Sequence, residues 1–441
     1  MSSARLAIDG GAPIIGSRFQ LRRYQLQHGI ARSYDLMKTV ASVVRGTTSI
    51  AAGADVGIVA RVEREFCQLT GARYSVAMNS GTASLHSAYF AVGVGPGSEV
   101  IVPAYTWHAT ATPILLCGAK PVFCEIDPET LNADPEDIER RITERTRAVC
   151  VLHAWGNPAE MDRILEIANR HHLYVIEDCS HAHGARYRDR SVGSWGHVGC
   201  FSLQGSKAVD GGEAGIAVTD DPELYDRMIL LGHNYLMGHG AEKAGTFGYG
   251  DISLGVKYRP HLAAMYLAHA SLGRLERRNQ RARRAWNLLC EELRDVPCLH
   301  AIAELPGSER GGYYFFVFDY RGEEGGGLST PDFVAALKAE GVPVDLDEYR
   351  DALLHTLPVF TQLDRSKLGG GCYDPTRPLE ENLWKGDLPV TEQITRRLIR
   401  FQTVLWAMPD GYVRRCAQAV KKVLAATLPV VGGTSGASGS E

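Results

Sequence analysis

The feature that most constrains the fold is a regular alternation of short β-rich runs with helix-like runs between Tyr74 and Asp220. The predicted strands are residues 74–78, 99–102, 121–125, 148–153, 173–176, 198–202 and 216–219. Helix-like segments at 82–91, 106–117 and 161–171 lie between them. This alternation is typical of an α/β domain with a mostly parallel sheet, in which ligands bind beyond the carboxyl ends of the strands.

Weaker patterns flank this region. Residues 1–30 have no clear period, and we interpret them as an arm that packs on the body or on a partner subunit. Apolar residues at helical spacing predict a helix at 59–69 and a long helix at 261–294. Further helices are expected at 331–340 and 393–405, and further strands at 313–320 and 342–345.

These patterns predict a division of the chain into four parts. After the N-terminal arm we expect a large α/β domain at 31–274 and a smaller C-terminal α+β domain at 275–428. Residues 429–441 are rich in Gly and Ser, so we expect a disordered tail there.

Composition excludes several classes of protein. A net charge of -4 in 441 residues gives no general attraction to nucleic acid or to an anionic membrane. No apolar run has the length of a signal peptide or of a membrane span, so a cytoplasmic location is the simplest interpretation. The ten cysteines are spread singly, which favours buried free thiols, and no HExxH motif indicates a metal site.

A lysine stands where one predicted strand ends. Lys207 follows the strand-like start of residues 200–203 and precedes a glycine-rich return at 211–215. Strand ends on a rigid scaffold often display catalytic groups. Taken alone, however, a lysine is more often a solvated surface residue.

Three other strand ends carry suitable partners for this lysine. Gly81 and Thr82 open a helix, which suits a phosphate, although Thr82 could equally be part of an ordinary helix cap. Asp178 could hold a ring nitrogen in its protonated form, or only end a strand in a turn. Trp107 could be a core aromatic or a platform for a flat cofactor. A phosphate cradle, a platform, an acid and a lysine together are what pyridoxal phosphate requires.

With these residues in place, the sequence resembles the sugar and cyclitol aminotransferases of the DegT/StrS type. These enzymes have the aspartate aminotransferase fold (fold type I) and depend on pyridoxal phosphate. The resemblance covers roughly residues 7–426 and is carried by the motifs at 79–83, 102–107, 153–162, 176–185 and 201–207.

The resemblance implies specific roles for the residues that face the cofactor ring. Lys207 is expected to form the Schiff base with the cofactor and then to move the proton between substrate and cofactor carbons. Asp178 is expected to pair with the pyridine nitrogen, and His181 to lie near the ring or its phenolic oxygen. Trp107 is expected to stack on the ring.

The resemblance also implies how the phosphate is held. Gly81, Thr82 and Ser202 are expected to bind it within one subunit. Catalytic sites of this type are completed across a homodimer, where an asparagine usually reaches the phosphate of the neighbouring subunit's cofactor. Lys257 stands at that position here and can neutralise a phosphate as a point charge.

Two further positions depart from the usual pattern of the family. His181 stands where glutamine is common, although histidine also occurs there. Ala214 replaces a second glycine in the glycine-rich return.

The implied activity moves an amino group from glutamine or glutamate to a keto cyclitol or keto sugar, in aminoglycoside or other secondary-metabolite biosynthesis. The N-terminal arm resembles that of members acting on inosose-type ketones, and Lys207 favours a transaminase over related dehydratases. One alternative is an acceptor linked to a nucleotide, with Arg259 or residues 277–284 as donors to its diphosphate. Another is a cofactor-binding regulatory subunit without turnover.

Overall fold

The computed structural model describes residues 5–16, 37, 40–41, 57–233, 254, 256–322, 327–362 and 383–427. The expected tail at 429–441 and residues 17–30 of the expected arm lie outside this range.

A sheet of seven strands forms the first part of the molecule, in the order β1-β9-β8-β5-β4-β2-β3. Its strands are β1 (Tyr74–Met78), β2 (Glu99–Pro103), β3 (Lys120–Cys124), β4 (Thr146–Leu152), β5 (Tyr174–Asp178), β8 (Val198–Ser202) and β9 (Gly215–Thr219). Only β9 runs against the others. The predicted mostly parallel α/β sheet is confirmed, and β1 and β8 have the predicted bounds.

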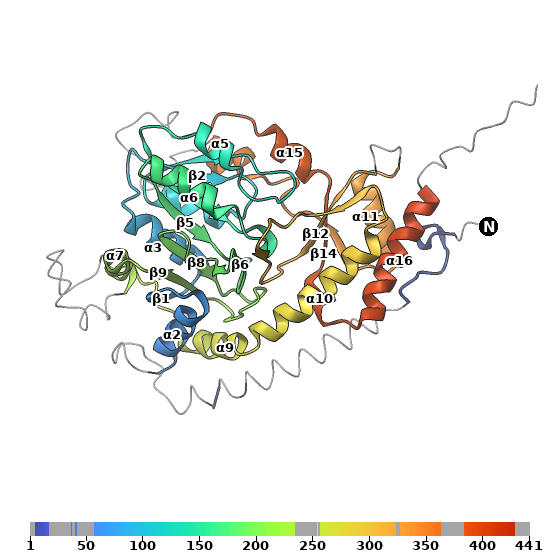
Figure 1. The fold of residues 1–441 in the computed structure, drawn as a ribbon, viewed down its shortest axis with the longest axis horizontal. Coiled ribbons are helices and arrows are strands. Elements are labelled where there is room, and N and C mark those ends of the chain that lie inside the picture. The colour runs from blue at the N-terminus through green and yellow to red at the C-terminus, as the bar shows by residue number, and fades with distance from the viewer. Residues whose placement is uncertain are drawn as a thin grey trace, which may run out of the picture.

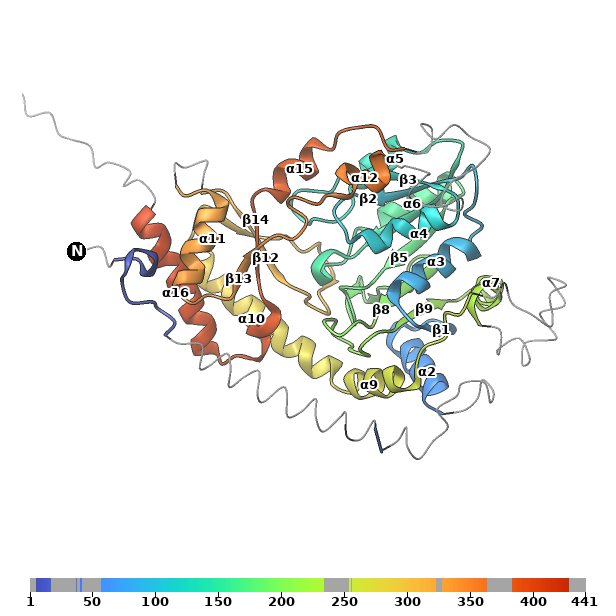
Figure 2. The same ribbon diagram turned by 180° about the vertical axis from the view of Figure 1, so that it is seen from behind.

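Helices cover both faces of this sheet, which explains why its strands are buried on both sides. Figure 1 shows α6 (Met161–Arg170) over one face, and Figure 2 shows α3 (Gly81–Ala91) and α4 (Thr112–Leu116) over the other. The remaining helices of this part are α2 (Ile58–Thr70), α5 (Pro135–Arg140), α7 (Pro222–Gly232) and α9 (Leu262–Leu272). Within α3, small residues such as Ala83, Ser84 and Ala88 are buried, which allows the helix to approach the sheet closely.

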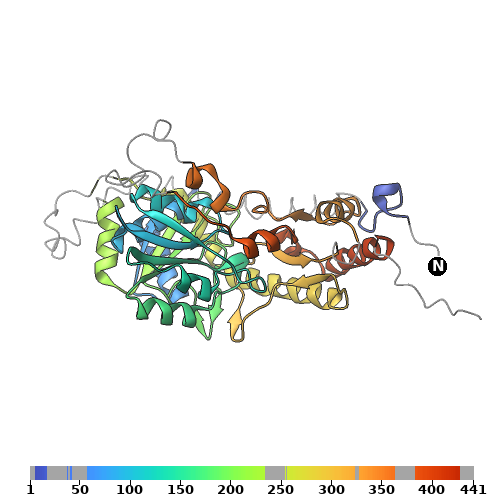
Figure 3. The same ribbon diagram turned by 90° about the horizontal axis from the view of Figure 1, so that it is seen from above.

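A second sheet lies beside the first and has the order β10-β12-β14-β13. Its strands are β10 (Leu299–Ala301), β12 (Phe316–Tyr320), β13 (Val344–Leu346) and β14 (Leu398–Phe401), and all of its pairings are antiparallel. The helices α10 (Leu275–Leu293), α11 (Thr330–Ala339) and α16 (Asp410–Thr427) share one apolar core with it. Figure 3 shows the two parts side by side, with the long axis running through both.

Smaller elements complete the described chain. A short antiparallel sheet joins β6 (Arg186–Tyr187), β7 (Arg190–Ser191) and β11 (Ser308–Glu309). Short helical segments occur at η1 (Ala7–Asp9), η3 (His108–Thr110), η4 (Ala154–Gly156), η7 (Leu354–Thr356), α12 (Pro358–Thr361), α15 (Pro389–Thr395) and η8 (Thr403–Ala407). The cysteines of the described segments are all free. None of the described helices is long and apolar enough to cross a membrane.

The described start of the arm packs on the second part of the molecule. The buried carboxylate of Glu340 accepts hydrogen bonds from the backbone N–H groups of Ala7 and Ile14, both at 2.9 Å. The ammonium group of Lys422 lies 2.8 Å from the same carboxylate. Glu340 therefore fixes residues 5–16 against α11 and α16.

The helix predicted at 393–405 is wrong. Ile394, Leu398, Phe401 and Leu405 have helical spacing, but α15 ends at Thr395 and β14 then begins at Leu398. The strand forms because β12 and β13 offer pairing partners on both of its edges. Tertiary pairing overrides the local pattern here.

Two other predicted helices are interrupted. The helix expected at 261–294 is divided into α9 and α10 at Gly273 and Arg274. The helix expected at 106–117 consists of η3 and α4, and Pro113 lies in the first turn of α4, where its missing N–H is tolerated.

Because α9 packs on α2 and α10 packs on α16, we propose the boundary between the two parts near residue 274.

Candidate active site

One pocket of the described chain lies where strand ends of the first sheet meet residues from the second part. Asp178 and Ser202 are the last residues of β5 and β8, and Trp107 follows β2. Lys207 lines the same pocket from the loop after β8. The carboxyl ends of parallel strands share one edge of a sheet, so residues far apart in sequence meet here.

The start of α3 forms a cradle at this edge. The Ser80 hydroxyl caps the helix by accepting from the N–H group of Ala83 at 3.0 Å. The N–H groups of Gly81 and Thr82 come before this bond in the helix, and both residues line the pocket. A Cβ on Gly81 would lie 2.7 Å from the Cβ of Ser202, so only glycine fits against that strand end. Free N–H groups, the helix dipole and two hydroxyls suit a phosphate dianion.

Asp178 is buried and held in place by two hydrogen bonds. Its Oδ2 accepts from the Thr110 hydroxyl at 2.8 Å, and its Oδ1 accepts from the N–H group of Ser180 at 3.0 Å. The Thr106 hydroxyl lies 2.7 Å from that of Thr110 and extends the chain of hydroxyl groups. The carboxylate is therefore oriented toward the pocket before any ligand arrives.

Lys207 lies on a closed loop between β8 and β9. Two backbone hydrogen bonds close the loop. The N–H group of Gly205 donates to the carbonyl of Gly212, and that of Leu203 donates to the carbonyl of Ala214, both at 2.8 Å. Ala214 is buried, so the alanine in place of glycine leaves the return loop intact. Burial lowers the pKa of Lys207 to about 8, although nearby Asp178 opposes this shift. Near neutral pH an appreciable fraction of this amine is then unprotonated and nucleophilic.

His181 lies against two aromatic rings. Its imidazole stacks on Trp155 at 5.1 Å and on Tyr314 at 4.5 Å between ring centroids. Burial lowers the pKa of His181 well below its ordinary value, with a further contribution from the charge of Lys207, so the ring is neutral. Its Nδ1 is buried and has no hydrogen-bond partner among the described residues. A buried polar atom of this kind is suited to bond a ligand atom.

Comparison with known proteins decides the family. The model of the DegT/DnrJ/EryC1/StrS aminotransferase family matches residues 34–370. The chain belongs to this family.

Two relatives with named activities match most of the chain. The L-glutamine:2-deoxy-scyllo-inosose aminotransferase of Streptomyces kanamyceticus is 32% identical over 442 residues, covering 96% of this chain and 98% of that protein. The L-glutamine:scyllo-inosose aminotransferase of Streptomyces griseus is 36% identical over 372 residues, covering 81% and 84%.

Solved structures agree with the family. An aminotransferase from Psychrobacter cryohalolentis superposes with a TM-score of 0.73 at 25% identity, covering 89% of this chain and 96% of that one. DesI, solved in the presence of its TDP-sugar product, gives 0.67 at 26% identity, covering 89% and 90%. The expected fold and the expected class, a pyridoxal-phosphate-dependent aminotransferase, are confirmed.

Three observations show that the described pocket suits pyridoxal phosphate, the cofactor of this class of aminotransferase. The close contact between Gly81 and Ser202 brings the first N–H groups of α3 beside the Ser202 hydroxyl at the pocket, a donor set that suits a phosphate. Asp178 is a buried, oriented carboxylate, and Nδ1 of His181 finds no hydrogen-bond partner in the part of the chain that the structure describes. Which of these residues touch the cofactor stays a prediction.

Two predicted residues lie in different surroundings. Trp107 is 53% exposed and lines the pocket beside His108, so the alternative of a core aromatic is wrong. Lys257 is exposed and is not among the pocket-lining residues. Its carbonyl accepts from the Asn79 amide at 3.2 Å, next to the phosphate cradle. Its expected contact with a partner's cofactor stays a prediction.

The sequence did not point to several residues that line the pocket. Three of them come from the second part of the molecule, namely Tyr314, Glu348 and Tyr349. No local pattern marks them, because they reach the pocket only through the packing of the two parts. Thr106 and Thr110 had a signal, since their spacing of four places two hydroxyls on one side of a turn.

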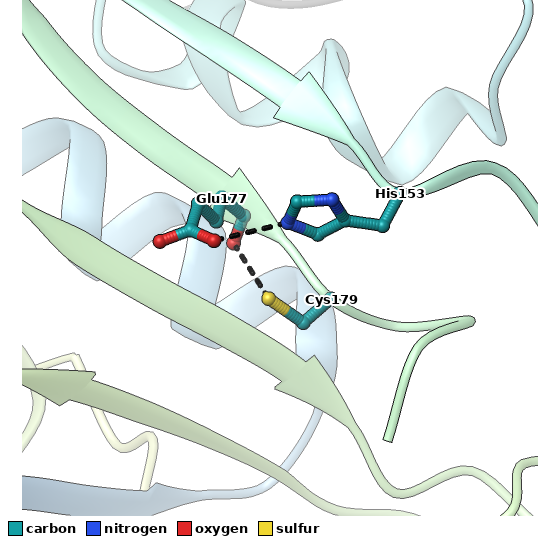
Figure 4. A group of neighbouring side chains, drawn as sticks. All are labelled: His153, Glu177 and Cys179. Carbon is teal, nitrogen blue, oxygen red and sulfur yellow. Dashed lines mark hydrogen bonds and ion pairs between the residues drawn. The ribbon is translucent and has the colours of Figure 1, made fainter. Parts of the chain in front are cut away.

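A second polar cluster lies where β4 and β5 end, and Figure 4 shows its three side chains. His153, Glu177 and Cys179 are buried, and their potential ligand atoms lie within 4.8 Å of one another. The imidazole Nε2 of His153 is 3.0 Å from Oε2 of Glu177. Such a group has the residue types of a metal site.

The hydrogen bonds of the cluster indicate a structural role instead. Oε1 of Glu177 accepts from the N–H group of Gly196 at 2.6 Å, and its Oε2 accepts from that of Gly193 at 2.7 Å. Nδ1 of His153 accepts from the N–H group of Ala159 at 3.1 Å, which places the imidazole proton on Nε2. Because these atoms already form hydrogen bonds within the protein, the cluster holds β5 against the loop before β8.

Proposed function

We propose that this protein transfers an amino group from L-glutamine, or from glutamate, to the carbonyl carbon of a keto cyclitol. The observation that carries the proposal is the meeting of Lys207, Asp178 and the Gly81–Ser202 cradle in one pocket. Two inosose aminotransferases that match over most of the chain support this choice of substrates.

Each residue has a defined task in the proposed reaction. Pyridoxal phosphate supplies the electron sink for the substrate carbon that loses its proton. The amine of Lys207 holds the cofactor covalently and carries the proton between carbons, which its lowered pKa favours. Asp178 keeps a positive charge on the ring nitrogen, and Gly81, Thr82 and Ser202 hold the phosphate.

The charges that line the pocket favour a neutral acceptor. The carboxylates of Asp178, Glu213 and Glu348 line the pocket. Lys207 is the single cationic side chain among the described residues that line it. Carboxylates accept hydrogen bonds from vicinal hydroxyl groups, whereas they repel a diphosphate. An uncharged polyhydroxy ketone is therefore the better match.

A nucleotide-linked acceptor is the second candidate, favoured by the likeness to DesI with its TDP-sugar product. The basic residues of α10, which could have bound the diphosphate, give this candidate little support. The guanidinium group of Arg283 faces Glu309, that of Arg284 faces Asp410, and neither residue lines the pocket. Intact Lys207 and Asp178 also argue against a regulatory subunit without turnover.

We further propose that two copies of the chain form a homodimer with shared active sites. Lys257, which is exposed, would then reach the phosphate of the partner's cofactor. An active, strictly monomeric protein would exclude this role.

The decisive test follows the cofactor spectrum in two half-reactions. L-Glutamine or L-glutamate is expected to convert the cofactor to its aminated form. A panel of inososes and nucleotide-linked keto sugars then shows which ketone restores the aldehyde form. Lys207→Ala is expected to lose more than about 100-fold in rate and to lose the borohydride-reducible link, whereas the exposed Lys257→Ala keeps that link. Restoration by a nucleotide-linked sugar alone would replace our proposal with the second candidate.

A further inference from the structure

Tyr314 reaches the catalytic edge of the first sheet from the second part of the molecule. It stands two residues before β12, on a segment with unusually close backbone contacts. The N–H group of Gly311 donates to Gly156 at 3.1 Å, and that of Gly312 donates to the Asn279 side chain at 3.1 Å. A Cβ on Gly312 would lie 2.2 Å from the carbonyl oxygen of His181. The segment is therefore fixed against the wall of the pocket.

Three contacts place the phenol ring of Tyr314 against the lysine loop. The Nζ atom of Lys207 lies 3.7 Å from the ring centroid. The ring stacks on His181 with an interplanar angle of 18°. The phenol oxygen lies 3.0 Å from the Ser206 hydroxyl, which in turn donates to Gln204.

We propose that Tyr314 is the positioning residue that holds the ammonium group of Lys207 whenever the lysine is not linked to the cofactor. The proposal rests on the proposed function, in which Lys207 alternates between a covalent link and a free amine. An aromatic face attracts an ammonium group, and more strongly where water is excluded. The ring would keep the free amine beside the reacting carbon instead of letting it swing into solvent.

The electrostatics of the lysine agree with this role. Burial lowers the pKa of Lys207, and the charges of Asp178 and Glu348 counteract it. The ring face acts in the same direction as these carboxylates because it favours the charged form. Loss of the aromatic face should therefore lower the pKa of Lys207 further.

Two substitutions separate the ring face from its bulk and from its hydroxyl. Tyr314→Phe keeps the aromatic face and removes the bond to Ser206. Tyr314→Leu keeps an apolar side chain that excludes water but has no aromatic face. Ser206→Ala removes the hydroxyl partner while leaving the ring.

The pKa of Lys207 can be measured in the full-length protein freed of cofactor, by competitive acetylation across pH 6–10 with mass spectrometry. We expect Tyr314→Leu to lower it by about 0.5–1 unit, and Tyr314→Phe and Ser206→Ala to shift it by less than about 0.3 unit. The exposed Lys257, read in the same samples, is expected to stay unchanged.

Other outcomes would overturn the proposal. A pKa in Tyr314→Leu equal to or above that of the unaltered protein would show that the ring does not hold the ammonium. A shift in Ser206→Ala as large as that in Tyr314→Leu would assign the effect to the hydroxyl network. Because this readout needs neither cofactor nor ketone, it stands even if no ketone of the panel is aminated.

Kinetics of the loaded enzyme give a second readout. Tyr314→Leu is expected to lower kcat by roughly tenfold with little change in KM, since the ring acts on the lysine and not on the substrate. Tyr314→Phe is expected to restore most of this loss. A rise in KM with unchanged kcat would instead make Tyr314 a substrate-binding residue and would contradict the proposal.

Discussion

Gly81 at the start of α3 and Ser202 at the end of β8 are in such close contact that a Cβ on Gly81 would overlap the serine, at 2.7 Å from its Cβ. The helix thus begins directly on the neighbouring strand end. This contact aligns the first N–H groups of α3 with the Ser202 hydroxyl.

Gly81→Ala is expected to weaken cofactor binding by about tenfold to hundredfold, since overpacking at such a contact costs about 1–3 kcal/mol. Titration of the cofactor-free protein with pyridoxal phosphate measures the change in Kd. Gly95→Ala is the matched control, because a Cβ on Gly95 would meet nothing within 4 Å. Equal affinity of the two variants would show that the cradle does not hold the phosphate.

Asp178→Asn is expected to bind the cofactor but to slow the glutamine half-reaction by more than about 100-fold. The carboxamide keeps the shape of the side chain and loses the charge that stabilises a protonated ring nitrogen. Thr110→Val leaves the charge of Asp178 in place but removes the hydrogen bond to Oδ2 together with that to the Thr106 hydroxyl, and is expected to cost roughly fivefold. Stopped-flow spectra give both rates, and an unaffected Asp178→Asn would exclude the ion pair.

Asp347 is expected to make stability depend on pH. Burial raises its pKa from 3.8 to about 7, although the Tyr105 hydroxyl and the N–H group of Tyr349 donate to it. Between these two pH values the folded protein binds more protons than the unfolded chain, so stability falls as pH rises, by about 1.4 kcal/mol per unit. Above pH 7 this contribution is constant.

Asp347→Asn should remove this part of the pH dependence. Urea unfolding of both proteins at intervals between pH 4 and pH 8 measures the difference. Parallel curves for the two proteins would mean that Asp347 is ionised throughout this range.

Glu177→Ala is expected to destabilise the fold by more than about 3 kcal/mol, because it leaves two buried donors and one partly buried donor without an acceptor. Thermal unfolding measures this loss as a lower Tm. Treatment with a chelator is expected to leave the Tm of the unaltered protein unchanged. A fall in Tm on chelation that zinc reverses would make the cluster a metal site.

The sequence was sufficient to predict the fold wherever the local pattern of residues agrees with their surroundings in the folded protein. The buried strands of the first sheet are short apolar runs, and the segments that end them carry Asp178, Ser202 and Lys207, so their convergence followed from parallel topology. The pocket contains every predicted site residue except Lys257. The cytoplasmic location stays a prediction.

The rest depended on contacts between segments distant in sequence. Residues 398–401 have an apolar spacing that also fits a helix. They form a strand because they pair with β12 on one side and β13 on the other. Tyr314 and Glu348 enter the pocket because the second sheet docks beside the first, which no local pattern encodes. The helix expected at 261–294 ends early at Gly273, because a glycine lowers helix stability without requiring a break, and only the fold decides whether one occurs.

The alternation of side chains along β5 has a consequence for how this enzyme can change. Glu177 points to the hydrogen-bonded cluster and Asp178 to the pocket, since consecutive strand residues face opposite sides. An insertion or deletion of one residue in β5 would turn the two carboxylates to the opposite faces of the sheet, and would remove the structural anchor and the predicted partner of the ring nitrogen together. Natural variation and engineering can therefore alter the length of the loops at this edge, but not the length of this strand.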